Sequence, residues 1–282
     1  MIRKLTDALA AIYPPNEARA IAFALLEDVF GLSRTDVWLG KADALSEEAQ
    51  ELLHQSMQRL LKGEPLQYVV GTALFGDLRL RVTPATLIPR PETLELVEWI
   101  VADNRNSHPH ILDIGTGSGC IAISLALKLP NAIVKAWDIS SEALEVAQSN
   151  ALHHGANVDF EWVDVLGANP TQPTFTTIVS NPPYICESER SEMAPHVLNH
   201  EPATALFVPD SDPLLFYRTI ANIGTKLLLP GGALYFEINR AYGEATCELL
   251  RNLGYTNVAL QKDSFGNDRM VRGFLPDAIY SS

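Results

Sequence analysis

The stretch that decides the fold is Ile111-Leu112-Asp113-Ile114-Gly115-Thr116-Gly117-Ser118-Gly119-Cys120. It is typical of a strand over 111–114 that runs through glycines into a helix over 121–129. Glycines at such a turn let the backbone bend sharply and approach a ligand closely. The spacing is Gly-x-Gly-x-Gly, which differs from the dinucleotide pattern Gly-x-Gly-x-x-Gly, and Cys120 stands where a P-loop needs lysine. Nicotinamide and nucleoside triphosphate sites are therefore disfavoured.

The chain after this stretch alternates between strand and helix patterns. Strands are predicted over 132–137, 158–163, 177–180, 233–238, 257–261 and 270–274, and helices over 141–152, 214–229 and 243–253. Pro230-Gly231-Gly232 is expected to turn the chain into the strand over 233–238. Repeated strand–helix units predict a mostly parallel, doubly wound α/β sheet. The turn at 263–268 predicts that the last two strands form an antiparallel pair.

Acidic residues end the two strands that follow the glycine turn. Asp138 stands 19 residues beyond Gly119, and Asp164 ends the next strand. In open α/β sheets a ligand binds beyond the carboxyl ends of the strands, where a carboxylate can accept hydrogen bonds from both hydroxyls of a ribose. Asp-x-Gly-x-Gly-x-Gly with such an acid resembles the S-adenosylmethionine site of class I methyltransferases.

Asn181-Pro182-Pro183-Tyr184 directly follows the strand over 177–180, at the same end of the sheet. Two prolines stiffen the turn and leave carbonyl oxygens without local donors. A planar NH₂ group could donate to the Asn181 side-chain oxygen and to the Pro182 carbonyl, while Tyr184 stacks on the substrate. In an isolated loop the same tetrapeptide would be only a turn. In this position it predicts an acceptor site for methyl transfer, which depends mainly on alignment and desolvation.

The N-terminal part is predicted to be a small helical bundle over residues 1–65. Apolar residues recur at helical spacing in three groups: Leu5, Leu9 and Ile12; Ala22, Leu25, Leu26, Val29 and Phe30; and Leu52, Leu53, Met57, Leu60 and Leu61. Pro14-Pro15-Asn16 interrupts the first helix, with Asn16 expected to cap the second, Gly31 to end it and Ser46 to cap a later one. Substrate docking and plain packing are both open as its role.

Two further domain boundaries are predicted. Residues 66–90 are expected to form a β-hairpin linker, because Leu78, Leu80 and Val82 alternate with arginines after a turn at Gly76-Asp77. Residues 91–282 are expected to form the methyltransferase domain.

Composition sets limits on partners and location. The chain has 282 residues, 47% of them hydrophobic, and a net charge of 21 − 34 = −13. This charge argues against a nucleic-acid surface, which needs Lys and Arg. Three scattered cysteines suit a reducing compartment, so the cytoplasm is expected. No apolar run is long enough for a membrane span, and the seven histidines show no metal-ligand spacing beside the cysteines. Membrane, nucleic-acid and metal binding are therefore not expected.

Over nearly its whole length the sequence resembles the release factor glutamine methyltransferases, the PrmC/HemK family. The resemblance rests on these segments: Glu64-Pro65-Leu66-Gln67-Tyr68 with Gly71, Leu87-Ile88-Pro89-Arg90-Pro91-Glu92-Thr93, Leu112 to Gly119, Asp138-Ile139-Ser140, Val179 to Ile185, Glu201-Pro202 with Ala205-Leu206, and Asn267-Asp268-Arg269. The Ile-Pro-Arg-Pro-Glu-Thr segment discriminates best, because Asn-Pro-Pro-Tyr also occurs in adenine-methylating DNA enzymes.

The resemblance implies transfer of a methyl group from S-adenosylmethionine to the side-chain amide nitrogen of a glutamine. That glutamine belongs to the Gly-Gly-Gln motif of peptide chain release factors in translation termination, and the product is N(5)-methylglutamine. The implied fold is a Rossmann-like seven-stranded domain with one antiparallel strand, a helical N-terminal domain and a hairpin linker. The expected cofactor-binding residues are Asp113, Gly115, Thr116, Gly117, Ser118, Gly119, Asp138, Asp164, Val165 and Asn181. The substrate-binding residues are Asn181, Pro182, Pro183 and Tyr184, and Asn181, Pro182 and Tyr184 are expected to be catalytic.

Three positions depart from the family pattern. Leu94 replaces an acid, Val165 replaces a frequent aromatic residue, and Glu237-Ile238-Asn239 has asparagine where glycine is usual. Other activities remain open: a glutamine methyltransferase of a large-subunit ribosomal protein, a nucleic-acid amino methyltransferase and a non-enzymatic cofactor-binding scaffold. The nucleic-acid activity is disfavoured by the charge, since even residues 1–75 carry 7 basic and 10 acidic side chains.

Overall fold

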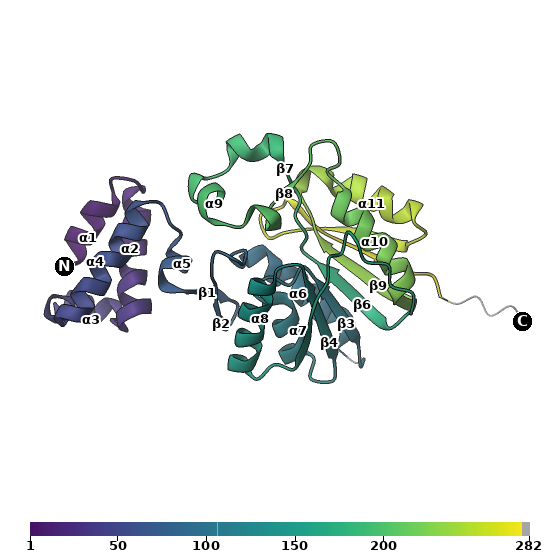
Figure 1. Ribbon diagram of the computed structural model, residues 1–282, viewed down its shortest axis with the longest axis horizontal. Coiled ribbons are helices and arrows are strands. Elements are labelled where there is room, and N and C mark those ends of the chain that lie inside the picture. Colours follow the sequence, from purple (N-terminus) through teal and green to yellow (C-terminus); the bar gives the residue numbers. More distant parts are fainter. Residues whose placement is uncertain (106, 278–282) are drawn as a thin grey trace, which may run out of the picture. The chain divides into compact units, whose positions relative to one another are not determined.

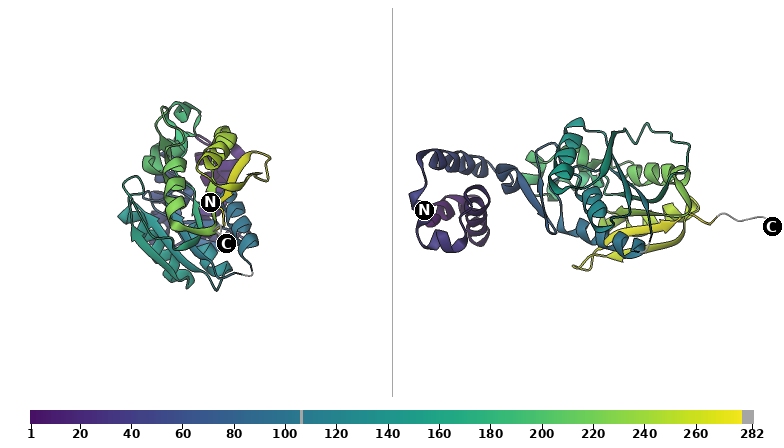
Figure 2. Two further views of the ribbon diagram at one scale, coloured as in Figure 1. Left: turned by 90° about the vertical axis from the view of Figure 1, so that its right-hand side faces the viewer. Right: turned by 90° about the horizontal axis from the view of Figure 1, so that it is seen from below.

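The computed structural model describes residues 1–105 and 107–277. Two compact units divide the chain: Met1–Thr72 with Met193–His200, and Ala73–Glu192 with Glu201–Ser282 (Figure 1; Figure 2 gives two further views). The last five residues of the predicted domain 91–282 lie outside the described part. The N-terminal segment of the first unit thus ends at Thr72, whereas the sequence places boundaries near residues 65 and 90.

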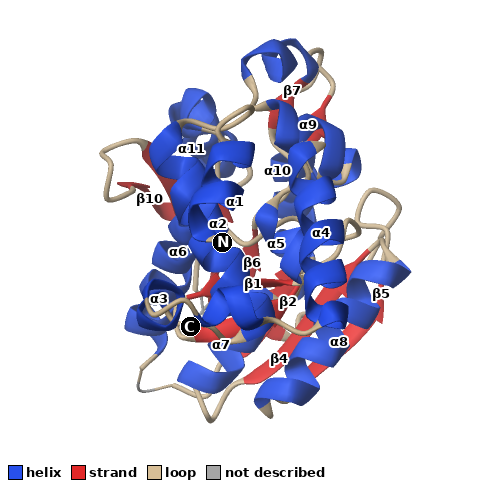
Figure 3. Ribbon diagram, turned by 90° about the vertical axis from the view of Figure 1, so that its left-hand side faces the viewer, coloured by secondary structure: helices blue, strands red, loops and turns tan. Residues whose placement is uncertain are grey.

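The first unit is built from helices around its own apolar core (Figure 3). Its helices are α1 (Ile2–Leu9), α2 (Pro15–Phe30), α3 (Arg34–Trp38), α4 (Glu47–Leu61), α5 (Leu66–Val70) and α9 (Pro195–His200), with a 3₁₀ turn, η1, at Lys41–Ala44. The buried core comes from α1 to α5 and η1 and includes Leu9, Leu25, Leu26, Leu60 and Val69. The expected helical bundle is therefore present.

Two of the three helix ends predicted in this unit are confirmed, and one prediction, the N-cap of α2, was wrong. Helix α2 begins at Pro15 with Pro14 as its N-cap, so Asn16 lies inside the first turn and the prediction that it caps was wrong. Proline suits the first helical position because its φ is preset and its missing N–H would have no helical partner. Gly31 ends α2 in the left-handed conformation, and the Ser46 hydroxyl accepts from Ala49 N at the start of α4, as predicted.

The expected hairpin is present but shorter than its predicted range. Strands β1 (Thr72–Phe75) and β2 (Leu78–Arg81) are joined through Gly76-Asp77, with Gly76 at a φ of 56°. Residues 66–70 form helix α5 instead. Beyond the hairpin, α6 (Pro91–Asn104) begins at a proline that follows the extended Arg90.

The second unit contains a seven-stranded sheet in the order β10-β11-β9-β6-β3-β4-β5. Its strands are β3 (His110–Ile114), β4 (Ile133–Asp138), β5 (Val158–Trp162), β6 (Phe175–Ser180), β9 (Leu228–Glu237), β10 (Thr256–Lys262) and β11 (Asp268–Phe274). Only β11 runs antiparallel to its neighbours β9 and β10. This confirms the predicted fold class. From β3 the strand order continues outward to β4 and β5 on one side, and β6 then pairs with β3 on its other side. The boundary between β3 and β6 is therefore the point at which the strand order reverses, where open α/β sheets bind ligands.

Strand β9 begins earlier than predicted. It runs from Leu228 through Pro230-Gly231-Gly232, which the sequence predicts as a turn. The pairing with β6 jumps from Phe175–Leu228 to Thr177–Ala233, so extra residues of β9 are accommodated as an irregularity.

Helices cover both faces of the sheet (Figure 1). Helices α6, α7 (Cys120–Lys128) and α8 (Ser141–His154) contribute to one apolar cluster, and α10 (Leu215–Leu227) and α11 (Gly243–Asn252) contribute to the other. Successive strand residues alternate between the two clusters, as Ile111 and Leu112 do, because side chains on a strand point to opposite faces. The rigid sheet thus fixes the loops at its carboxyl edge.

The remaining elements are short. They are β7 (Ile185–Cys186), η2 (Glu187–Glu192), η3 (Ala203–Ala205), β8 (Phe207–Val208) and η4 (Arg240–Tyr242). Strands β7 and β8 pair with each other in parallel. Within residues 1–105 and 107–277, no helix has both the length and the apolar character that crossing a membrane requires.

Candidate active site

The glycine loop between β3 and α7 is fastened to the end of the neighbouring strand. Gly115 N and Thr116 N donate to the Trp137 carbonyl at 2.8 and 3.1 Å. Gly117 and Gly119 have positive φ, as Gly115 does. A Cβ at Gly119 would lie 2.8 Å from Ile123 Cδ1, whereas nothing lies within 4 Å of a Cβ at Gly115 or Gly117. Gly119 therefore serves packing and backbone conformation, and the other two leave open space for a ligand.

Asp113 connects this loop to the first turn of α7 through hydrogen bonds. Its fully buried carboxylate accepts at Oδ2 from Thr116 Oγ1 at 2.7 Å and from Ala122 N at 3.2 Å. Burial raises the pKa of Asp113 to about 7. Among the described residues, Asp113 Oδ1 and Ser118 Oγ are buried without a hydrogen-bond partner. Of these two residues, Ser118 lines the cavity described below, and an unpaired hydroxyl beside an open glycine loop fits a site that receives a polar ligand.

Asp138, the last residue of β4, is hydrogen-bonded to the same loop. Its Oδ2 accepts from Gly117 N at 2.8 Å, and its Oδ1 accepts from Ser140 N at 2.9 Å. Burial raises the pKa of the Asp138 carboxyl, against the opposite effect of these backbone donors. A carboxylate oxygen has two lone pairs, so each oxygen keeps the capacity to accept from a ribose hydroxyl.

A cavity of about 380 Å³ lies at the carboxyl edge of the sheet, within the second unit. Its size suits a small-molecule ligand. Ten of the predicted site residues line it: Gly115, Thr116, Gly117, Ser118, Asp138, Asp164, Val165, Asn181, Pro182 and Pro183. Among the described residues of the predicted set, Asp113, Gly119 and Tyr184 are not part of the lining. The structure thus brings the glycine loop and the first three residues of the tetrapeptide to one cavity.

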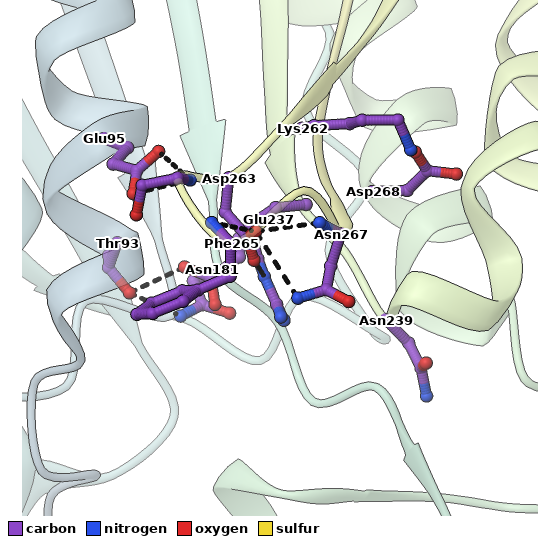
Figure 4. Close-up of polar contacts among 12 residues, drawn as sticks. Thr93, Glu95, Asn181, Glu237, Asn239, Lys262, Asp263, Phe265, Asn267 and Asp268 are labelled. Carbon is purple, nitrogen blue, oxygen red and sulfur yellow. Dashed lines mark hydrogen bonds and ion pairs between the residues drawn. The ribbon is translucent and has the colours of Figure 1, made fainter.

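Two polar residues that the sequence analysis did not assign lie near Asn181: Thr93, which lines the cavity, and Glu237, which lies behind it. Asn181 Nδ2 donates to Thr93 Oγ1 at 3.4 Å, and Thr93 Oγ1 donates to Glu237 Oε2 at 2.6 Å (Figure 4). The Tyr184 hydroxyl donates to Glu237 Oε1 at 3.3 Å. Glu237 is only 1% exposed, and burial is the main cause of its raised pKa. The sequence contained one indication of this role, because Glu237 is an acid at the carboxyl end of β9, the end of the sheet where the cavity lies.

A half-buried ion pair between Arg90 and Glu201 fixes the loop before α6. Glu201 Oε1 lies 2.5 Å from Arg90 Nη2, and Glu201 Oε2 accepts from Ile88 N at 3.2 Å. Arg90 lines the cavity together with Thr204 and Ala205. Glu201 therefore joins two walls of the cavity that are far apart in the chain.

The three departures from the family pattern have defined surroundings. Leu94 lies against the hairpin turn, since a Cβ at Gly76 would be 3.3 Å from its Cδ2. Val165 lines the cavity. The Asn239 side chain donates to the Tyr184 carbonyl at 3.2 Å and accepts from Ala241 N at 3.0 Å, so it holds the end of the tetrapeptide.

The sheet order, the glycine loop and the acid that ends β4 define a class I methyltransferase. A family model for the methyltransferase small domain matches residues 95–207, and one for the PrmC N-terminal domain matches residues 1–71. A methyltransferase structure from Pyrococcus furiosus shares the fold, with a TM-score of 0.53, 21% identity and coverage of 79% of this chain and 98% of that chain.

Relatives with curated names identify the family within this class. The release factor glutamine methyltransferase of Bacteroides thetaiotaomicron is 48% identical over 268 residues, which are 95% of this chain and 96% of that protein. The enzyme of the same name from Flavobacterium psychrophilum is 43% identical over 274 residues, with coverage of 95% and 96%. The chain belongs to the release factor glutamine methyltransferase family. It is an S-adenosylmethionine-dependent protein glutamine methyltransferase, which confirms the resemblance seen in the sequence.

Proposed function

We propose that the protein methylates the side-chain amide nitrogen of the glutamine in the Gly-Gly-Gln motif of peptide chain release factors. The product of this reaction is N(5)-methylglutamine. The observation that carries the proposal is the position of Asn181 and Pro182 on the same cavity as the open glycine loop. The printed names of relatives that share nearly the full length add support for the substrate.

The cofactor would lie between the glycine loop and the ends of β4 and β5. S-Adenosylmethionine supplies a methyl group that its sulfonium activates toward nucleophiles. Asp138 would accept from the ribose hydroxyls, and Val165 would contact the adenine. Gly115 and Gly117 would give the cofactor close access to the backbone, because a Cβ at either would meet open space. The unpaired Ser118 Oγ, on a residue that lines the cavity, fits a polar ligand at the loop.

The acceptor glutamine would be held by Asn181 and Pro182. The Asn181 Oδ1 and the Pro182 carbonyl would each accept one N–H of the amide, which aims the nitrogen lone pair at the methyl carbon. Methyl transfer would form a new C–N bond as the C–S bond breaks; the electron pair of that bond would stay on sulfur, and the amide nitrogen would lose its extra proton to water. Alignment in a largely desolvated cavity supplies most of the rate enhancement for such an in-line displacement.

The helical first unit is proposed to dock the protein substrate. Its buried core draws only on residues up to Val70, and the residues that line the cavity come from positions 85 to 220. The first unit is thus not needed to build the cavity, which leaves recognition of a large acceptor as its role. We place the reaction in the cytoplasm, on the basis of the three scattered free cysteines.

The test is methyl transfer from labelled S-adenosylmethionine to a purified release factor. The matched control is the same release factor with the Gly-Gly-Gln glutamine replaced by alanine. Label on the first protein alone would establish the reaction, the substrate and the modified residue together. Label on neither would contradict the proposal, and the glutamine of the large-subunit ribosomal protein would be the next acceptor to measure.

A further inference from the structure

Thr93 and Glu237 form a buried relay behind Asn181. Thr93 is 2% exposed and lies in the first turn of α6, and Glu237 is the last residue of β9. The relay runs from Asn181 Nδ2 to Thr93 Oγ1 and on to Glu237 Oε2, as the dashed lines of Figure 4 show. Thr93 and Asn181 line the cavity, whereas Glu237 lies behind them. An inner polar chain therefore contacts the residue that is proposed to receive the substrate amide.

The chemistry of the three groups gives the relay a direction. An ionised carboxylate only accepts hydrogen bonds, so the single hydroxyl proton of Thr93 is committed to Glu237. The Thr93 oxygen can then only accept from Asn181, which requires the NH₂ side of the Asn181 amide to face Thr93. The Asn181 carbonyl oxygen is thereby left for the cavity. The reverse orientation would present an NH₂ group to an acceptor amide that also needs to donate.

We propose that Thr93 and Glu237 are positioning residues that orient the Asn181 side chain with its carbonyl oxygen toward the acceptor. They thereby select a substrate that presents an amide NH₂ group. This inference rests on the proposed function, in which Asn181 accepts a hydrogen bond from the glutamine side chain. Neither residue contacts the reacting atoms, so both act through Asn181.

The surroundings of Glu237 determine how the relay responds to pH. The titratable or charged groups near its carboxylate are Glu92 on α6, Cys120 on α7, Tyr184 after β6, Tyr217 on α10 and Arg269 on β11. Arg269 is itself bonded to Asp263, at 3.1 Å. Burial raises the pKa of Glu237, so lowering the pH protonates it sooner than an exposed glutamate. A protonated Glu237 can donate to Thr93, which frees the Thr93 proton for Asn181 Oδ1 and reverses the relay.

The first test compares Thr93→Val with Thr93→Ser, which keeps the hydroxyl. Thr246→Val is the matched control, because Thr246 is fully buried and its hydroxyl donates to the Tyr242 carbonyl at 2.8 Å, away from the cavity lining. We expect Thr93→Val to lower kcat about tenfold to a hundredfold, less than the full loss of an oriented catalytic dipole. Thr93→Ser should restore most of the kcat that Thr93→Val loses. Thr246→Val should stay near the wild-type kcat, and the KM for S-adenosylmethionine should not change in any of the three. Equal kcat for Thr93→Val and Thr93→Ser would overturn the proposal.

A second measurement reports the amide orientation without any substrate. The ¹⁵N–¹H signals of the Asn181 side-chain NH₂ group are assigned by their loss in Asn181→Ala. They should shift in Thr93→Val and remain in place in Thr93→Ser and Thr246→Val. Unmoved signals in Thr93→Val would show that Thr93 does not hold the amide. Binding of S-adenosylhomocysteine, measured by calorimetry, identifies variants that are merely unfolded.

The third measurement is the pH profile of kcat for Glu237→Gln. A glutamine can turn either its oxygen or its NH₂ toward Thr93, so both directions of the relay become available. The wild-type enzyme should exceed the variant at neutral pH, and their ratio should shrink as the pH falls and Glu237 is protonated. A constant ratio would contradict the role of Glu237. Wild-type enzyme that leaves release factors unlabelled would instead refute the proposed function, so the two failures are distinguished.

Discussion

At the scale of single residues, the proposed acceptor site depends on the direction in which the Asn181 side-chain amide points. Asn181 lies directly after β6, where the sheet edge fixes its backbone, and Thr93 Oγ1 lies 3.4 Å from its Nδ2. Its other neighbours, Pro182 and Pro183, have no N–H groups that would compete for a bound amide. Asn181 therefore combines a fixed backbone position with a side-chain oxygen that, under our proposal, accepts from the substrate amide.

Replacement of Asn181 by alanine should remove one of the two acceptors for the glutamine amide. We expect the loss of transition-state stabilisation to be about 2–4 kcal/mol, by analogy with the removal of one oriented polar partner. The measurement is kcat/KM for release factor methylation. Asn222→Ala is a suitable control, because Asn222 is an exposed residue of α10. Turnover unchanged in Asn181→Ala would exclude Asn181 from the acceptor site.

Asp138 should make cofactor binding depend on pH. Burial raises its pKa, so the ionised form that accepts from ribose hydroxyls is lost sooner as the pH falls. Affinity for S-adenosylmethionine should therefore decrease toward acid pH in the wild type. Asp138→Asn should bind more weakly at neutral pH with a flatter profile, and Asp159→Asn on the exposed part of β5 should behave as the wild type. Calorimetry showing wild-type affinity for Asp138→Asn would remove Asp138 from the site.

At the scale of elements, the junction of β3 with α7 requires glycine for two reasons, the backbone conformation and the close packing of side chains. Gly119 has a φ of 83°, and a Cβ there would lie 2.8 Å from Ile123 Cδ1 and 3.2 Å from Ala147 Cβ. Gly155 ends α8 with a φ of 66° and has open space around it. The two glycines share the left-handed conformation and differ in what surrounds them.

Alanine at these two glycines should separate strain from packing. Gly155→Ala adds only the left-handed strain, about 1 kcal/mol. Gly119→Ala adds an overpacked contact between α7 and α8 as well, for a total loss of about 2–4 kcal/mol. Urea unfolding monitored by a probe in the second unit measures both. Equal losses would mean that α7 and α8 move apart without penalty.

At the scale of the whole molecule, the chain consists of two units with separate apolar cores, and we propose that the second unit binds the cofactor while the first docks the substrate. The apolar cores of the two units share no residue among those described: one ends at Val70, and the other clusters begin at Phe75. A sheet with two covered faces supports the cavity, and the helical unit has a core of its own. This arrangement is what a small catalytic site needs when its substrate is a large protein.

Removal of residues 1–72 should therefore leave cofactor binding intact. We expect the fragment 73–282 to bind S-adenosylhomocysteine with near wild-type affinity, since the cavity lining starts at Ala85. Methylation of an intact release factor should fall by about tenfold for each 1.4 kcal/mol of docking energy that is lost. A short peptide that contains Gly-Gly-Gln provides the comparison, because it has no surface to dock. Full activity of the fragment on the intact release factor would argue against a docking role.

Local sequence rules predicted the order of elements, the glycine loop and the tetrapeptide, because strand alternation, glycine turns and proline stiffening act over a few residues. They misplaced the N-cap at Asn16 and the start of β9, where a preset proline φ and pairing with β6 decided the outcome. The contacts of Asn181 with Thr93 and of Arg90 with Glu201 join residues 88 and 111 positions apart. Only the tertiary structure decides such contacts, because burial and hydrogen-bond partners arise when distant segments pack together.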